Sequence, residues 1–141
     1  MLCQIVIDTN VFISALRSKF GASYKLLMSL ENGKFETNVS VSLAMEYEEV
    51  SKRILSEIQL TKNEVEDVLN YVISAANRRK VYYLWRPFLP DSKDDLVLEL
   101  AVAANCEIIV TFNKKHFRGV EKFGIKTMTP QEFLREIGEI K

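Results

Sequence analysis

The stretch that decides the fold lies at the start of the chain and reads CQIVIDTNVFISAL, from Cys3 to Leu16. Its first part, residues 3–7, is a short apolar run, which predicts a strand buried on both faces. Asp8 follows at once, and a helical pattern covers residues 10–18. In an open α/β sheet the carboxyl ends of the strands border the crevice where ligands bind, so we expect Asp8 to face that crevice. A carboxylate that loses water there needs a partner such as a metal ion.

The composition is that of an ordinary soluble protein. The chain has 141 residues, of which 48% are hydrophobic and 27% are charged, and this excludes a disordered chain and fits one domain over residues 1–141. The apolar runs are too short for a membrane span and no leader precedes Ile5, so we expect a cytoplasmic protein without membrane contact. Cys3 and Cys106 have neither disulfide nor zinc spacing. The formal net charge is zero, so contact with nucleic acid depends on local basic patches.

Strands and helices alternate along the chain in the way that is typical of a parallel sheet covered by helices. The sequence therefore predicts a three-layer α/β/α sandwich whose central, mostly parallel sheet has about five strands. Thr61 and Thr129 have the spacing and neighbours of helix caps. The predicted strands cover residues 3–7, 35–40, 81–84, 106–110 and 125–128; the predicted helices cover residues 10–18, 22–31, 43–58, 62–79 and 91–105, with a last helix after Thr129.

One acid of the helix predicted over residues 43–58 is expected to look inward. At about 100° per residue, Glu46 lies roughly 60° from Leu43, at the edge of the apolar stripe, whereas Glu48 and Glu49 face solvent. Glu46 also comes in the first turns after a strand, so it belongs to the same end of the sheet as the first strand's acid. The alternative interpretation is an edge residue whose carboxylate simply reaches water.

Three acids stand within five residues at the start of the helix 91–105. Helix capping and the helix dipole account for one or two of them, with Asp91 as the cap and Asp94 in the third position. Three acids exceed what capping requires. Because the helix is apolar almost all round, its periodicity cannot choose between Asp94 and Asp95.

Polar residues also follow the strand predicted over residues 106–110. Thr111 and Asn113 offer neutral oxygens at the same end of the sheet, and the lone His116 is either a ligand or base, or a surface residue in a basic loop. The carboxylates described above would repel one another in one crevice. Oxygen donors without paired His or Cys select a hard dication, Mg²⁺ or Mn²⁺. Such a crevice is typical of phosphodiester hydrolysis.

The ordered set of these motifs resembles the PIN-domain nucleases, in particular the VapC-like toxins of prokaryotic toxin–antitoxin systems. The resemblance covers essentially the whole chain and implies metal-dependent cleavage of RNA. It further implies that Asp8, Glu46 and Asp95 bind the metal and carry catalysis; Asp95 stands directly before the apolar helix, sixteen positions ahead of Thr111. The motifs are IVIDTNVF (residues 5–12), SLAME (residues 42–46), DSKDD (residues 91–95) and IVTFN (residues 109–113).

The resemblance also implies supporting residues and partners. Many family members carry a fourth acid at or near the position of Asn113, so we expect one firmly held ion, with another arriving alongside the substrate phosphate. A protein antitoxin is implied as a partner. The supporting residues are Thr9, Asn10 and Ser14 around Asp8, Asp91 and Asp94 in the loop before the helix, and Thr111 and Asn113; the residues expected to contact RNA are Arg17, Lys19, Lys114, Lys115 and Arg118.

Other interpretations fit the motifs less well. A phosphatase of the haloacid-dehalogenase type would have a second Asp where Asn10 stands, a receiver domain would have an acidic pair at the first strand, and no P-loop motif is present. The main alternative is a PIN-like module with weak or lost catalysis that binds RNA or a protein, because Asn113 adds no charge to the crevice.

Self-association is the last expectation from the sequence. The helices 43–58 and 62–79 carry apolar residues beyond one core stripe, which suits a homodimer or higher oligomer, or an antiparallel pair of helices packed within one chain. The residues concerned are Leu60, Val68, Leu69, Tyr71 and Val72.

Overall fold

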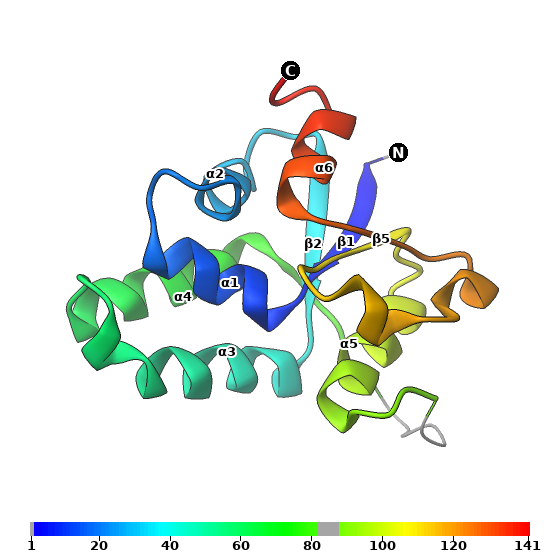
Figure 1. The fold of residues 1–141 in the computed structure, drawn as a ribbon, viewed down its shortest axis with the longest axis horizontal. Helices are drawn as coiled ribbons and strands as arrows, with labels where there is room; N and C mark the ends of the chain where they lie inside the picture. The colour runs from blue at the N-terminus through cyan, green and yellow to red at the C-terminus, as the bar shows by residue number, and fades with distance from the viewer. Residues whose placement is uncertain (1, 82–87) are drawn as a thin grey trace.

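The computed structural model describes residues 2–81 and 88–141, and its centre is a parallel sheet (Figure 1). Within these residues the sheet has five strands in the order β3-β2-β1-β4-β5, and every neighbouring pair is parallel. The strands are β1 (Cys3–Ile7), β2 (Phe35–Val39), β3 (Asn77–Arg78), β4 (Ile108–Val110) and β5 (Lys126–Met128).

Helices cover both faces of this sheet. Helix α5 packs against β1, β2 and β4, whereas α1 packs against α2, which in turn contacts α6. Right-handed crossovers put the β1–β2 and β2–β3 connections on one face and the returning β3–β4 connection on the other. The predicted three-layer α/β/α class is therefore confirmed, and none of the described helices is long and apolar enough to cross a bilayer. The helices are α1 (Thr9–Arg17), α2 (Ala22–Met28), α3 (Val41–Arg53), α4 (Lys62–Ala75), α5 (Ser92–Ala103) and α6 (Pro130–Glu136).

The sequence signals that act over short distances are confirmed. Ile5, Val6 and Ile7 are at most 1% exposed, as expected of a strand covered on both faces. Thr61 and Thr129 both form capping boxes, in which the threonine hydroxyl and a glutamate three residues later exchange hydrogen bonds with the backbone. Both cysteines are free.

Two of the predicted helices end four or more residues earlier than expected. The helix predicted over residues 62–79 ends at Ala75, and Asn77 and Arg78 instead pair with β2. The backbone N–H of Arg79 also donates to the carbonyl of Val39, with 2.8 Å between N and O. The edge of β2 therefore gains hydrogen bonds that a longer helix would leave unmade. The strand predicted over residues 81–84 lies, from residue 82 on, outside the described residues.

The predicted helix 43–58 is also shorter, because α3 ends at Arg53 and a 3-10 turn follows at Leu55–Glu57. The turn keeps Ile54 buried. The apolar residues noted on α4 and beside it pack within the chain: Leu69 and Val72 are buried, and Leu60, Val68 and Tyr71 are partly buried against the core. This matches the interpretation as intramolecular packing, and self-association stays a prediction.

The strand order creates a crevice at one end of the sheet. From the central strand β1 the chain moves to β2 and β3 on one side, then returns across the sheet to β4 on the other. The carboxyl ends of β1 and β4 thus form a topological switch point, where α/β proteins bind ligands. Asp8 follows β1 directly and Thr111 follows β4 directly.

Candidate functional site

Asp8 is fixed at the switch point by contacts from both central strands. It caps α1, and its Oδ1 accepts the backbone N–H of Thr9 at 2.8 Å. Its Oδ2 accepts the hydroxyl of Thr111 at 2.7 Å, and its own backbone N–H donates to the carbonyl of Val110 at 2.9 Å. The side chain is thereby held where β1 and β4 end.

The surroundings of Asp8 act on its charge in opposite directions. Burial raises the pKa of the Asp8 carboxyl, the hydrogen bonds from Thr111 and Thr9 oppose that shift, and the nearby charge of Glu46 adds to it. The carboxylates of Asp8 and Glu46 are therefore close enough to repel each other. This is the convergence that the sequence predicted for these two residues.

Tyr47 explains why Glu46 reaches the same place. The hydroxyl of Tyr47 donates a hydrogen bond to the carbonyl of Ile7, the last residue of β1. The Tyr47 ring stacks on Phe12 with centroids 4.7 Å apart and an interplanar angle of 16°. These contacts tie α3 to the end of β1, and the adjacent Glu46 side chain, 11% exposed, faces inward. The sequence gave no sign of the hydrogen bond from Tyr47.

The start of α5 brings further carboxylates to the switch point. Asp91 is the N-cap of α5, and its side chain accepts the backbone N–H of Lys93 at 2.8 Å. Burial, followed by repulsion from Asp8 and Asp91, raises the pKa of Asp94 from 3.8 to about 6. The Nδ1 atom of His116 lies 3.6 Å from Asp94 Oδ2. Asp94 therefore belongs to the same electrostatic group as Asp8.

Asp95 points elsewhere. It is 6% exposed, and its carboxylate accepts the backbone N–H groups of Phe88 (3.1 Å to Oδ2) and Leu89 (2.9 Å to Oδ1). Consecutive helical residues point about 100° apart, which agrees with the different directions of Asp94 and Asp95. The structure brings Asp94, and not the sequence-preferred Asp95, together with Asp8 and Glu46.

The carboxylates of Asp8, Glu46, Asp91 and Asp94 line a cavity of about 550 Å³, which we call the acidic pocket. Its carboxylates come from the end of β1, from α3 and from the start of α5, so three separate parts of the chain build it. The residues that line it and were singled out from the sequence are Asp8, Thr9, Asn10, Ser14, Arg17, Glu46, Asp91, Asp94, Asn113 and His116.

Thr111 connects the supporting residues of the pocket. Besides donating to Asp8, its hydroxyl oxygen accepts the backbone N–H of Asn113 at 3.0 Å and the side-chain amide of Asn10 at 3.4 Å. The amide oxygen of Asn10 accepts the backbone N–H of Phe112 at 3.4 Å. Asn10 thus acts on Asp8 through Thr111, whereas the sequence resemblance implied that it braces Asp8 itself.

The donor set of the pocket suits a hard dication by its chemistry, since it consists of carboxylate and amide oxygens. Among the described residues, however, no group of three or more His, Cys, Asp or Glu side chains is arranged so that it could hold a metal ion as it stands. Lys93 Nζ lies 3.6 Å from Glu46 Oε1, and His116 lies beside Asp94. Metal binding at this place would require Glu46 to turn from Lys93, and Asp94 from His116, toward Asp8.

The basic residues expected to contact RNA lie at four different places. Lys114 is engaged with α6, because its Nζ lies 2.5 Å from Glu132 Oε1. Lys115 and Arg118 line a second cavity beside the acidic pocket. Arg17 lines the acidic pocket, and Lys19 lines a separate cavity between α1, α2 and α4.

The fold and the pocket define an α/β/α protein with a cluster of carboxylates at the switch point of a parallel sheet. The PIN domain family matches residues 4–115, and the chain belongs to this family. The resemblance inferred from the motifs is thereby confirmed.

Individual relatives agree with this assignment. A VapC ribonuclease of Pyrococcus furiosus is 24% identical over 130 residues, which cover 87% of this chain and 86% of the relative. Two solved structures share the fold. VapBC2 from Rickettsia felis, bound to a DNA fragment from its promoter, has a TM-score of 0.58 at 15% identity and covers 88% of this chain and 98% of its own. A PilT N-terminus domain protein from Sulfolobus solfataricus P2 has a TM-score of 0.56 at 16% identity, with 98% and 96% covered.

Proposed function

We propose that the protein is an endoribonuclease that depends on Mg²⁺ or Mn²⁺ and hydrolyses phosphodiester bonds of RNA at the acidic pocket. The observation that supports this most is the convergence of Asp8, Glu46 and Asp94 at the switch point, where burial and mutual repulsion raise the pKa of Asp8 and of Asp94. Carboxylates that repel one another in a pocket are stabilised by a dication. The similarity to a VapC ribonuclease supports RNA as the substrate.

Asp8, Glu46 and Asp94 would hold the metal in this proposal, and the side-chain oxygen of Asn113 would add a neutral ligand. Asp94 thus takes the role that the family resemblance gave to Asp95. A bound Mg²⁺ or Mn²⁺ supplies the activation of a water molecule and the neutralisation of charge on the cleaved phosphate.

The chain's own residues prepare this chemistry. The hydroxyl of Thr111 and the backbone N–H of Thr9 hold both oxygens of Asp8 in place and favour its charged form. Lys93 and Arg17 line the same pocket and are cations that can move from a carboxylate to a substrate phosphate. Binding of RNA would therefore release the carboxylate of Glu46 from Lys93.

The proposal extends to partners and location. We propose that the protein forms a homodimer, is inhibited by a protein antitoxin and acts in the cytoplasm on cellular RNA. The fold shared with the Rickettsia felis VapBC2 toxin–antitoxin assembly supports the antitoxin. Light scattering of the pure protein would measure its oligomeric state.

Cleavage of a labelled single-stranded RNA with Mn²⁺, Mg²⁺ or a chelator tests the function directly. The variants Asp8→Asn, Glu46→Gln and Asp94→Asn should abolish cleavage and weaken Mn²⁺ binding measured by calorimetry. Glu48→Gln is the matched control for Glu46, because Glu48 lies on the same helix but is exposed and pairs only with Lys52 among the described residues.

Two outcomes would contradict the proposal. Cleavage that survives in Asp8→Asn would reveal a contaminating nuclease. Tight RNA binding without cleavage in the presence of any metal would favour the catalytically weak binding module instead. This module is the second candidate, because Asn113 adds no charge to the pocket.

A further inference from the structure

A second cavity, of about 310 Å³, adjoins the acidic pocket, and we call it the side cavity. Asp91, Asp94 and His116 line both cavities, so the two lie next to each other at these residues. The remaining lining of the side cavity differs from that of the acidic pocket, because it combines apolar residues with cations. These residues are Phe88, Leu89, Pro90, Lys115 and Arg118.

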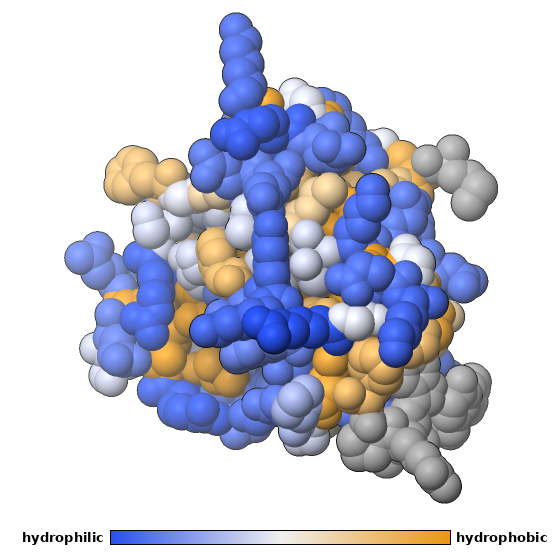
Figure 2. Space-filling view, turned by 45° about the vertical axis from the view of Figure 1, so that its right-hand side comes forward, coloured by the Kyte–Doolittle hydropathy of each residue, from blue (hydrophilic) through white to orange (hydrophobic). Residues whose placement is uncertain are grey.

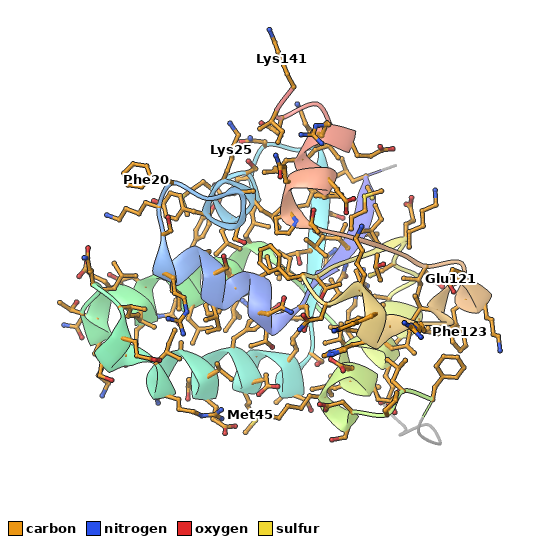
Figure 3. The ribbon with its side chains drawn as sticks, viewed as in Figure 1. Phe20, Lys25, Met45, Glu121, Phe123 and Lys141 are labelled. Atoms are coloured by element: carbon orange, nitrogen blue, oxygen red, sulfur yellow. The ribbon has the colours of Figure 1, made fainter. Side chains whose placement is uncertain are left out.

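The ring of Phe88 contacts three neighbouring residues and is 37% exposed. It meets the ring of Phe123 edge to face, with centroids 5.2 Å apart at 78°, and Lys122 Nζ lies 5.7 Å from its centroid. It also passes close to Gly119, where a Cβ atom would lie 3.1 Å from the ring. Phe123 is labelled in Figure 3, on the side of the molecule where α5 begins. Phe88 therefore contributes a partly exposed aromatic surface to the lining of the side cavity.

Asp95 fixes the backbone that carries this ring. Its carboxylate accepts the N–H groups of both Phe88 and Leu89, and hydrogen bonds from backbone donors to a buried carboxylate are strong. The adjacent acids Asp94 and Asp95 thus have different roles: Asp94 lines both cavities, and Asp95 holds the backbone of the residues that form the apolar wall of the side cavity.

The cations of the side cavity are available to a ligand. Lys115 and Arg118 are exposed, and neither forms an ion pair with another residue in the described part of the chain, in contrast to Lys114, which is engaged by Glu132. In Figure 2, which turns this side of the molecule forward, hydrophobic residues lie next to hydrophilic ones. An aromatic surface beside unpaired cations is the arrangement that binds single-stranded nucleic acids, in which bases stack and phosphates pair with the cations.

We propose that the side cavity binds one base of single-stranded RNA, stacked on Phe88, while Lys115 and Arg118 contact the flanking phosphates. This inference rests on the proposed function, because the acidic pocket next to it would receive the phosphate that is cleaved. The volume lies at the lower end of the range of small-ligand pockets, about 300–1,000 Å³, which suits a single base rather than a base pair. The side cavity therefore selects unpaired RNA for the acidic pocket.

Binding of a short fluorescein-labelled oligouridylate tests this site, with Ca²⁺ in place of Mn²⁺ and recovery of intact RNA checked on a gel. A second probe is the abasic ribose-phosphate oligomer of equal length. Phe88→Ala should weaken oligouridylate binding about 5- to 150-fold, as the loss of one base stacked on an aromatic ring does, and should leave the abasic probe unchanged. Phe88→Leu should show the same pattern with a smaller loss. Charge reversal at Lys115 and Arg118 should weaken both probes and flatten the salt dependence of binding.

Phe20→Leu is the matched control, since Phe20 is fully exposed and lies far from Phe123 in Figure 3; it should leave binding unchanged. Circular dichroism and melting curves establish that each variant is folded. Equal binding of oligouridylate by wild type, Phe88→Leu and Phe88→Ala, with Mn²⁺-dependent cleavage intact, would overturn the base site and leave the nuclease proposal standing. A wild-type protein that neither binds nor cleaves RNA would overturn both.

Discussion

Replacement of Asp94 by asparagine should stabilise the metal-free protein while abolishing its activity. The Asp94 carboxyl is 14% exposed and has its pKa raised from 3.8 to about 6 by burial and by repulsion from Asp8 and Asp91. At 1.36 kcal/mol per pKa unit, keeping this group charged costs the folded state about 3 kcal/mol at most. Asparagine has nearly the same shape and removes that cost.

A second effect works in the opposite direction. Asp94 stands in the first turn of α5, where a negative charge gains about 0.3–1 kcal/mol from the helix dipole, and asparagine loses this gain. The cost of burial and repulsion together is larger than this gain, so we expect the free energy of unfolding to rise by about 1–2 kcal/mol in the presence of a chelator. For a chain of this length the melting temperature should rise by roughly 3–8 °C.

The pH dependence identifies the cause. Below pH 3.8 the carboxyl is protonated in both the folded and the unfolded state, so the advantage of Asp94→Asn should vanish there. The advantage should grow between pH 3.8 and about 6, where only the unfolded state loses the proton, and stay constant above. Urea unfolding at several pH values measures this.

Metal should reverse the order of stability. A dication at about one hundred times its dissociation constant would stabilise the wild type by about 2.7 kcal/mol and Asp94→Asn much less. Glu48→Gln removes an exposed carboxylate that pairs with Lys52 at 3.2 Å, and should change stability by only a few tenths of a kcal/mol. An Asp94→Asn protein that is less stable than wild type near pH 8 in chelator, or more stable by the same amount at all pH values, would refute the reasoning.

Three further variants test the contacts around the site. Thr111→Val removes the hydrogen bond that opposes the raised pKa of Asp8, so the acid limb of the pH–cleavage profile should move to higher pH; an unmoved limb would remove Thr111 from this role. Tyr47→Phe leaves the carbonyl of Ile7 without its side-chain donor and should lower the free energy of unfolding by about 1–2 kcal/mol, as chemical denaturation would measure. Asp95→Asn should weaken RNA binding without changing the Mn²⁺ affinity measured by calorimetry, because Asp95 holds the backbone of Phe88 and does not line the acidic pocket. A loss of Mn²⁺ affinity would instead indicate that Asp95 is a metal ligand.

The features that sequence alone predicted depend on residues close together in the chain. The buried strand before Asp8, the capping boxes at Thr61 and Thr129, and the inward face of Glu46 all follow from local spacing, and the structure has them. The end of α4 was not predicted, because it depends on a strand that is distant in the sequence: Asn77 pairs with β2 instead of extending the helix. Local periodicity carries no information about an unsatisfied strand edge elsewhere in the sheet.

The site shows the same division. The order of strands and helices along the sequence was enough to predict that Asp8, Glu46 and the acids of residues 91–95 lie at one end of a parallel sheet, because strand direction fixes which loops share an end. The same order could not decide between Asp94 and Asp95, because α5 is apolar almost all round and either acid could have faced the pocket. The packing of α5 on the sheet fixes the rotation of the helix about its axis, and the backbone N–H groups of Phe88 and Leu89 donate hydrogen bonds to Asp95. A helix without a polar face has its orientation set by the groups around it, and these come from distant parts of the chain.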